Sequence, residues 1–187
     1  MNRLETLGSI DEVFFNDPLV VNCGATSREL ASIRTAPNHL YMLDSMGLAA
    51  AVGLGLALAS DRHVGAIEGD GSLLMGLSVL ASIAFHRPQT FTLIVLDNHI
   101  HASAKSFPTQ SAEVSITELC RGAGLETRST SDLQELKSLL VTSRSSEEGP
   151  CVIVAEIEPQ NAAGIPFLLT DPVVVKQGFE EFLKEES

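Results

Sequence analysis

Cysteine is scarce in this 187-residue sequence. The three cysteines, Cys23, Cys120 and Cys151, are an odd number at wide spacing, and no CxxC pair occurs. A disulfide framework needs paired cysteines, and a zinc site typically uses closely spaced ones. The pattern therefore argues against both kinds of site and favours a reducing compartment, so we expect a cytoplasmic protein.

Basic residues are also few. Lysine and arginine total 12 against 24 acidic residues, for a formal net charge of −12. The acidic excess is concentrated towards the C-terminus, in the stretches SSEEGP and FEEFLKEES. Binding to nucleic acid or to an anionic membrane surface needs the opposite balance of charge. We therefore expect neither as a partner.

Long apolar runs are missing as well. The strongest, MGLAAAVGLGLALA at residues 46–59, is shorter than the roughly 20 residues of a membrane-spanning helix. Its glycines and alanines predict a buried helix that packs closely against its neighbours. The N-terminal stretch MNRLETLGSIDEVFF carries acidic residues and no continuous apolar segment, which is not the pattern of a signal peptide.

Short apolar runs alternate with helical segments along most of the chain. The runs are almost continuously apolar, as in strands buried on both faces. They lie at residues 18–23, 63–69, 90–97 and 150–158, with a further short strand predicted at 39–43. The helical segments often follow a serine or aspartate suited to an N-cap. They lie at residues 27–34, 46–60, 72–87, 115–124 and 131–145.

This alternation predicts one α/β domain over residues 1–187, with a parallel sheet and helices on both faces. The length suits a single domain with a substantial core. After Pro159 the pattern is less regular until residues 172–185, which predict an amphipathic helix that docks on the domain or on a partner.

Asp70 lies between two glycines at the end of an apolar run, in the stretch IEGDGSLLM. Ligands of parallel α/β sheets bind beyond the carboxyl ends of the strands. The glycines allow a sharp turn and a close approach of a ligand, and a helix opening at Ser72 would favour an anion. A carboxylate beside an anion needs a cation between them. Mg2+, which commonly bridges protein carboxylates to phosphate oxygens, is the natural candidate.

A second oxygen ligand is expected from the end of a neighbouring strand. The apolar run at residues 90–97 is followed by Asn98, and 98 − 70 = 28 residues suffice for a helix and a returning strand. The alternative is that GDGS is an ordinary left-handed turn that caps the next helix, and that DN is another turn. GDG alone does not decide between them. The ordered combination of strand, GDGS, apolar helix, strand and DN favours the binding site.

The segment from GDGSLLM to LIVLDN, residues 69–98, resembles the diphosphate-binding motif of the thiamine-diphosphate-dependent decarboxylases and their relatives. Within that superfamily the chain looks most like the sulfopyruvate decarboxylase β subunit and the corresponding half of phosphonopyruvate decarboxylase. NCGATSREL, LYMLDSMGLAAAVGLGLALA and the PTQ of residues 108–110 add to the resemblance. It covers roughly residues 18–160, leaves 160–187 as a C-terminal extension, and implies a thiamine-diphosphate-binding fold of the PP type.

The resemblance implies a site for thiamine diphosphate and Mg2+. Asp70 and Asn98 would hold the metal by their side chains, and Ile100 by its backbone carbonyl. Gly71 and Ser72 would contact the diphosphate where their helix starts. The other implied cofactor contacts are Gly24, Thr26, Ser45, Met46, Gly47 and Ala102.

Met46 would be the apolar wedge between the two rings of the cofactor. For an isolated methionine, an ordinary core position is the usual interpretation; its place in the DSMGLA segment favours the wedge. Gly24 and Thr26 follow the first strand and would line the diphosphate pocket.

Two stretches depart from the family pattern. Asp44 stands where the subfamily usually has glycine, and DNHIHAS, residues 97–103, replaces a glycine-containing run that usually includes a tyrosine. Both put the substrate, more than the cofactor, in question. In an extended chain His99 and His101 would point the same way, as a metal-binding pair would. The alternatives are a solvated loop, or His101 as a catalytic residue near the reacting carbon. No role is predicted for His39, His63 or His86.

The resemblance also implies a partner. Thiamine diphosphate attacks the carbonyl of a 2-oxo acid and accepts the electrons released as CO2 leaves. In the superfamily a glutamate on a separate pyrimidine-binding domain activates the cofactor, and that domain is not recognised here. We therefore expect the glutamate on a companion α subunit, in a hetero-oligomer of two α and two β subunits or larger. This chain alone would be inactive.

A small anionic 2-oxo acid such as sulfopyruvate or phosphonopyruvate would need a cation for its second anion. Arg28 and Lys105 are candidates by position only, and each is otherwise an ordinary surface charge. The leading prediction is a subunit of a split decarboxylase that forms CO2 and an aldehyde. The DNHIHAS stretch motivates carboligation as an alternative. A third possibility is a cofactor-binding protein without chemistry, against which the intact Asp70 and Asn98 argue.

Overall fold

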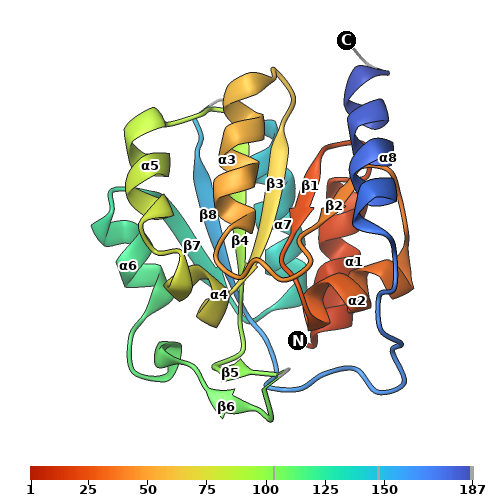
Figure 1. Ribbon diagram of the computed structural model, residues 1–187. Coiled ribbons are helices and arrows are strands. Elements are labelled where there is room, and N and C mark those ends of the chain that lie inside the picture. Colours follow the sequence, from red (N-terminus) through yellow and green to blue (C-terminus); the bar gives the residue numbers. More distant parts are fainter. Residues whose placement is uncertain (103, 147, 186–187) are drawn as a thin grey trace.

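A six-stranded parallel sheet forms the centre of the molecule (Figure 1). The structure is a computed structural model that describes residues 1–102, 104–146 and 148–185. The strands lie in the order β2-β1-β3-β4-β8-β7, and each neighbouring pair is parallel. They are β1 (Leu19–Val21), β2 (His39–Tyr41), β3 (Val64–Gly69), β4 (Phe91–Asp97), β7 (Glu126–Thr130) and β8 (Cys151–Glu156).

Helices cover both faces of this sheet (Figure 1), which confirms the predicted fold class. Helices α3 to α6 pack on one face, and α1, α2 and α7 on the other. Their bounds are α1 (Arg3–Val13), α2 (Ala25–Ile33), α3 (Ala49–Ala59), α4 (Asp70–Met75), α5 (Val79–His86), α6 (Ile116–Gly122) and α7 (Leu133–Ser145). Within the described residues, no helix combines the length and the apolarity needed to cross a bilayer.

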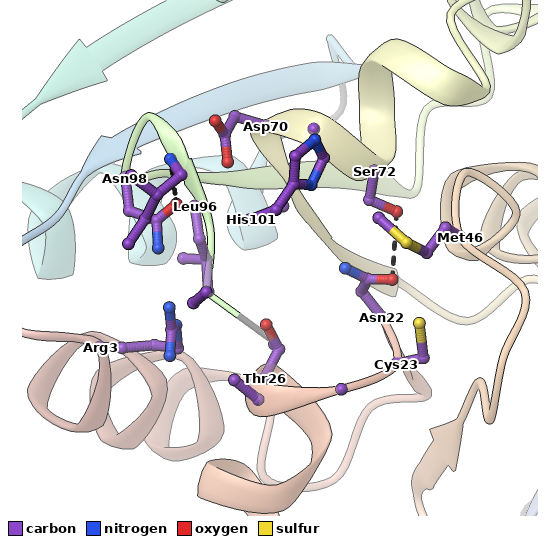
Figure 2. Close-up of a pocket in the computed structure, with 16 residues that line it drawn as sticks. Arg3, Asn22, Cys23, Thr26, Met46, Asp70, Ser72, Leu96, Asn98 and His101 are labelled. Carbon is purple, nitrogen blue, oxygen red and sulfur yellow. Dashed lines mark hydrogen bonds between the residues drawn. The ribbon is translucent and has the colours of Figure 1, made fainter. Parts of the chain in front are cut away.

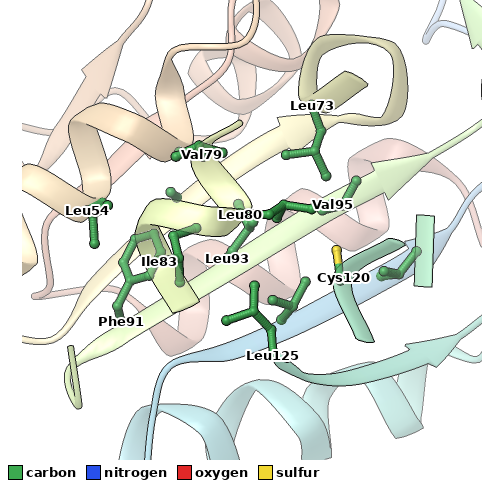
Figure 3. Close-up of a cluster of buried hydrophobic side chains, with 14 of the residues drawn as sticks. Leu54, Leu73, Val79, Leu80, Ile83, Phe91, Leu93, Val95, Cys120 and Leu125 are labelled. Atoms are coloured by element: carbon green, nitrogen blue, oxygen red, sulfur yellow. The ribbon is translucent and has the colours of Figure 1, made fainter. Parts of the chain in front are cut away.

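The central strands are largely apolar because successive side chains enter opposite cores. In β4, Leu93 and Val95 pack beneath α3 to α6 (Figure 3), whereas Ile94 and Leu96 pack beneath α1, α2 and α7. Complete burial of each such side chain stabilises the fold by about 1.5–3 kcal/mol. The continuous apolar run therefore predicted the strand and its central place correctly.

Several helices begin where a polar side chain caps them. Ser115 accepts a hydrogen bond from Glu118 N, and Asp132 accepts from Gln134 N and Glu135 N. Asp171 caps α8 (Pro172–Lys184), which lies alongside β2 and buries Phe179. The predicted C-terminal helix thus docks on the domain itself.

Some elements differ from the prediction. The expected helix at 72–87 is two helices, because the chain turns at Gly76, and the first helix begins at Asp70 rather than at Ser72. The expected helix at 46–60 begins at Ala49. The strand β7 was missed because it is an edge strand in which exposed polar residues break the apolar pattern.

The N-terminal helix α1 and the structure after β4 were also missed. Asn2 and Glu5 form a capping box that starts α1. After β4 the chain forms a short antiparallel hairpin of β5 (Ile100–His101) and β6 (Phe107–Pro108), and then the 3-10 helix η1 (Gln110–Ala112). The hairpin lies beyond the carboxyl ends of the sheet strands (Figure 1), where ligands of parallel sheets bind.

Candidate functional site

A pocket lies beyond the carboxyl ends of β1, β3 and β4 (Figure 2). It is lined by residues 22–26 after β1, by residues 69–72 where β3 ends and α4 begins, and by residues from the end of β4 and the hairpin, together with Arg3 and Met46. Most of the residues predicted from sequence lie on its wall. These are Gly24, Thr26, Met46, Asp70, Gly71, Ser72, Asn98, Ile100, His101 and Ala102.

The remaining predicted residues lie elsewhere. Gly47 and Ser45 belong to the loop behind Met46, and neither is among the described residues that line the pocket. Position alone had suggested Arg28 and Lys105 as substrate contacts, and the structure places both outside the pocket. The Arg28 guanidinium stacks over the Phe167 ring at 5.1 Å, and Lys105 is exposed between β5 and β6.

Asp70 is buried, and one of its carboxylate oxygens is fixed by hydroxyl groups. Its Oδ2 accepts hydrogen bonds from Thr109 and, at 2.7 Å, from Ser111 Oγ. In the described part of the chain no donor is recorded for the other oxygen, Oδ1. Oδ1 is also not among the fully buried atoms that lack a partner, so it is reachable from the pocket that Asp70 lines. The arrangement therefore leaves one oxygen able to bind a cation.

Ser111 also reaches a second carboxylate. Its Oγ lies 2.8 Å from Asp97 Oδ1 and 2.9 Å from His99 Nδ1. Burial, together with the nearby charge of Asp70, raises the pKa of Asp97. His99 thus contacts Asp97 and Ser111 and does not line the pocket, whereas His101 does. The two histidines therefore do not form the metal-binding pair that their spacing suggested.

Asn98 follows β4 directly and is buried. Its Oδ1 accepts a hydrogen bond from the backbone N–H of Ile100 at 3.2 Å, which turns the chain into the hairpin. Figure 2 shows Asn98 and Asp70 on the same side of the pocket. The parallel register of β3 and β4 brings these two strand ends together.

Gly71 allows the hairpin to close over α4. A Cβ atom on Gly71 would lie 2.3 Å from His101 Cε1 and 2.8 Å from Thr109 Cγ2. The sequence predicted that the GDG glycines would let a ligand approach closely. At Gly71 the group that approaches is the protein's own hairpin. It holds the His101 ring against the start of α4.

Ser72 ties three segments together beneath the pocket. Its Oγ accepts a hydrogen bond from Gly47 N at 2.8 Å and donates one to Asn22 Oδ1 at 3.1 Å. The hydroxyl is therefore engaged within the protein. In the described residues no side chain caps α4, so the backbone N–H groups at its start are not used by a cap. Ser72 can therefore offer an anion its backbone N–H.

The loop that carries Met46 is fixed by backbone contact and by a buried carboxylate. Gly47 has a positive φ of 82°, and its backbone packs directly against Gly76. Glu68 is fully buried, and its Oε1 accepts from Ala50 N at 3.0 Å where α3 begins. Burial raises the pKa of Glu68. Met46 is 38% exposed and lines the pocket, so it is not an ordinary core methionine.

Arg3, Thr109 and Ser111 were not anticipated at this site. Arg3 comes from α1. The capping box of Asn2 and Glu5 could have predicted the start of this helix from the sequence. Thr109 and Ser111 are far along the chain from Asp70, and PTQ had entered only through the resemblance. Of the two departures from the family pattern, His101 lines the pocket, whereas Asp44 is exposed outside it.

Comparison with known proteins identifies the family. The model of the thiamine pyrophosphate enzyme C-terminal TPP-binding domain matches residues 22–155. The chain belongs to this family. The TPP-binding domain assigned in this way begins directly after β1, runs from α2 almost to the end of β8, and contains all the pocket residues except Arg3.

Relatives of this TPP-binding domain include β subunits of a decarboxylase. The sulfopyruvate decarboxylase subunit β of Methanothermobacter thermautotrophicus is 33% identical, over 99% of this chain and 95% of its own. The corresponding subunit β of Methanocaldococcus jannaschii is 34% identical, over 94% of this chain and 93% of its own. Phosphonopyruvate decarboxylase of Streptomyces hygroscopicus is 34% identical over 89% of this chain, which spans 42% of that protein.

A solved structure supports the fold. A thiamin diphosphate-dependent enzyme from Mycobacterium smegmatis matches 86% of this chain with a TM-score of 0.74, at 23% identity. The match covers 32% of that longer chain. It confirms the arrangement of sheet and helices.

The contact between Gly47 and Gly76 can be tested by adding one carbon. Gly76→Ala is expected to lower the free energy of unfolding by about 1–3 kcal/mol, because the new Cβ would lie 2.0 Å from the Gly47 carbonyl oxygen. Gly55→Ala is the matched control on α3, where the new Cβ meets nothing within 4 Å and alanine favours the helix by about 1 kcal/mol. Urea unfolding measures both. Equal effects would contradict the close contact.

Proposed function

We propose that this chain is the diphosphate-binding subunit of a split thiamine-diphosphate-dependent decarboxylase of the sulfopyruvate or phosphonopyruvate type. The observation that carries the proposal is the pocket in which Asp70 and Asn98 meet at the ends of β3 and β4. Family membership and the full-length match to β subunits of sulfopyruvate decarboxylase support it.

The residues present fit Mg2+. Asp70 Oδ1 is unpaired in the described structure, and the Asn98 side chain and the Ile100 carbonyl would add neutral oxygens. Mg2+ prefers oxygen ligands and is commonly held by one or two carboxylates together with phosphate oxygens. Thr109 and Ser111 would keep Asp70 oriented, as hydrogen-bonded partners of metal ligands commonly do.

The same pocket provides groups for the rest of the cofactor. The backbone N–H groups of Gly71 and Ser72, with Gly24 and Thr26 opposite, would bind the diphosphate. Met46 would support the bend between the two rings. When bound, thiamine diphosphate supplies the electron sink for loss of CO2 from a 2-oxo acid. His101 lies on the pocket wall and would move a proton at the reacting carbon.

A companion α subunit completes the site in this proposal. The relatives named subunit β imply such a partner for themselves. On this chain, Leu48 and Met75 are exposed apolar side chains next to the pocket loop and α4. Exposed apolar side chains beside a cofactor site suit burial by another subunit. The companion would supply the activating glutamate, in a hetero-oligomer of two α and two β subunits or larger.

Removing the metal ligand tests the site. Asp70→Ala is expected to weaken Mg2+-dependent binding of thiamine diphosphate by more than about a hundredfold, measured by titration calorimetry with the companion present. Asp61→Ala, at an exposed aspartate before β3, is the control and should bind like the original protein. Unchanged binding by a folded Asp70→Ala protein would refute the metal assignment.

Reconstitution tests the reaction. This chain, its companion, thiamine diphosphate and Mg2+ should convert sulfopyruvate or phosphonopyruvate to CO2 and the corresponding aldehyde, and omission of either chain should abolish CO2 release. Coupled gas and aldehyde assays measure both products. A coupled carbon–carbon product in place of free aldehyde would select carboligation instead.

A further inference from the structure

Arg3 lies on the pocket wall, and its position is fixed from two sides. It starts α1 and is 6% exposed. Its Nη1 donates to Glu29 Oε1 at 2.8 Å and to Asn161 Oδ1 at 2.9 Å. A buried arginine held by two acceptors cannot swing freely, so it presents one orientation to the pocket.

The acceptors of Arg3 are themselves anchored. Glu29 on α2 is 1% exposed, and its Oε1 also accepts from Ala162 N at 3.1 Å. Asn161 Nδ2 donates to the carbonyl oxygen of Ala102 at 3.1 Å. Helices α1 and α2, the segment after β8 and the hairpin therefore meet at Arg3. Such support holds a binding group close to its working geometry.

The other edge of the guanidinium remains available. Arginine has five N–H donors, and Nη1 uses its two on Glu29 and Asn161. Within the described residues no acceptor is recorded for Nε or Nη2, and neither atom is among the fully buried nitrogens that lack a partner. Three donors of a buried arginine thus remain for a ligand in the pocket.

The position of Arg3 selects the part of the ligand that it meets. It lines the pocket together with Thr26 and Asn98, and Figure 2 shows it across the pocket from Met46. In the proposed function Met46 supports the rings, so Arg3 faces the far end of the cofactor. Arginine pairs with phosphate through two parallel hydrogen bonds. We propose that Arg3 binds the terminal phosphate of thiamine diphosphate, an inference that rests on the proposed function.

The Arg3–Glu29 pair is neutral as a whole, so its contribution is directional hydrogen bonding more than net charge. Glu29 holds the guanidinium in place, and the free edge selects a ligand that carries a phosphate at that point. The consequence is discrimination between thiamine diphosphate and thiamine monophosphate. Removing Arg3 should reduce that preference while leaving the ring contacts unchanged.

The test compares both ligands by titration calorimetry at saturating Mg2+, with the full-length chain and its companion subunit. Arg3→Met should lower the preference for thiamine diphosphate over the monophosphate about ten- to a hundredfold. Because this change leaves the buried Glu29 carboxylate without its cationic partner, the double variant Arg3→Met/Glu29→Gln is measured as well, and the same loss of preference is expected. Arg34→Met is the matched control. It breaks the Arg34–Asp11 pair, which joins the same two helices away from the pocket.

Each outcome decides the inference. The inference would be overturned if folded Arg3 variants kept the preference for thiamine diphosphate. It would also be overturned if they lost the same affinity for both ligands. A loss of preference of the same size in Arg34→Met would overturn it too. A raised KM for the 2-oxo acid with unchanged preference would assign Arg3 to the substrate anion instead. If the original complex binds neither ligand in an Mg2+-dependent manner, the proposed function itself fails, and that result is distinct from an unchanged preference.

Discussion

The buried carboxylate of Asp70 is the constraint on which the site depends. Leaving it in the interior without donors would be costly, and two hydroxyl groups from beyond the hairpin satisfy one of its oxygens. The chain after β4 must therefore return across α4 to bring Thr109 and Ser111 into place. Gly71 makes that return sterically possible, because a larger residue would collide with His101 and Thr109.

Close packing at glycine also shapes the other wall of the pocket. Gly47 and Gly76 allow two backbones to touch, and Ser72 joins that contact to the end of β1 through Asn22. These contacts hold Met46 at the pocket while leaving it partly exposed. The rigid parallel sheet supplies the strand ends, and the close packing around them sets which side chains face a ligand.

Local sequence pattern was sufficient for the central sheet and for the meeting of Asp70 with Asn98, whereas most other pocket residues were expected only from the family resemblance. Continuous apolar runs predicted β3, β4 and β8, and GDG followed by DN predicted that Asp70 and Asn98 would come together. The edge strand β7 was missed because its exposed polar residues carry no such run.

The hydroxyl donors to Asp70, and Arg3, could not be read from local pattern. Thr109 and Ser111 lie 39 and 41 residues from Asp70, and the pairing depends on a hairpin with no clear signal of its own. Arg3 enters the pocket only because α1 packs against α2, where Glu29 receives it. Arg28 and Lys105 show the converse, since proximity in sequence to pocket residues did not bring their side chains to the pocket.

The most direct test of this account is to locate the cation. Crystals of the chain with its companion, thiamine diphosphate and Mn2+ in place of Mg2+ would reveal the metal by anomalous scattering. The account predicts a peak about 2.1 Å from the side-chain oxygens of Asp70 and Asn98, with Thr109 and Ser111 still bound to the other oxygen of Asp70. A bound cofactor whose metal lies away from Asp70 would contradict it.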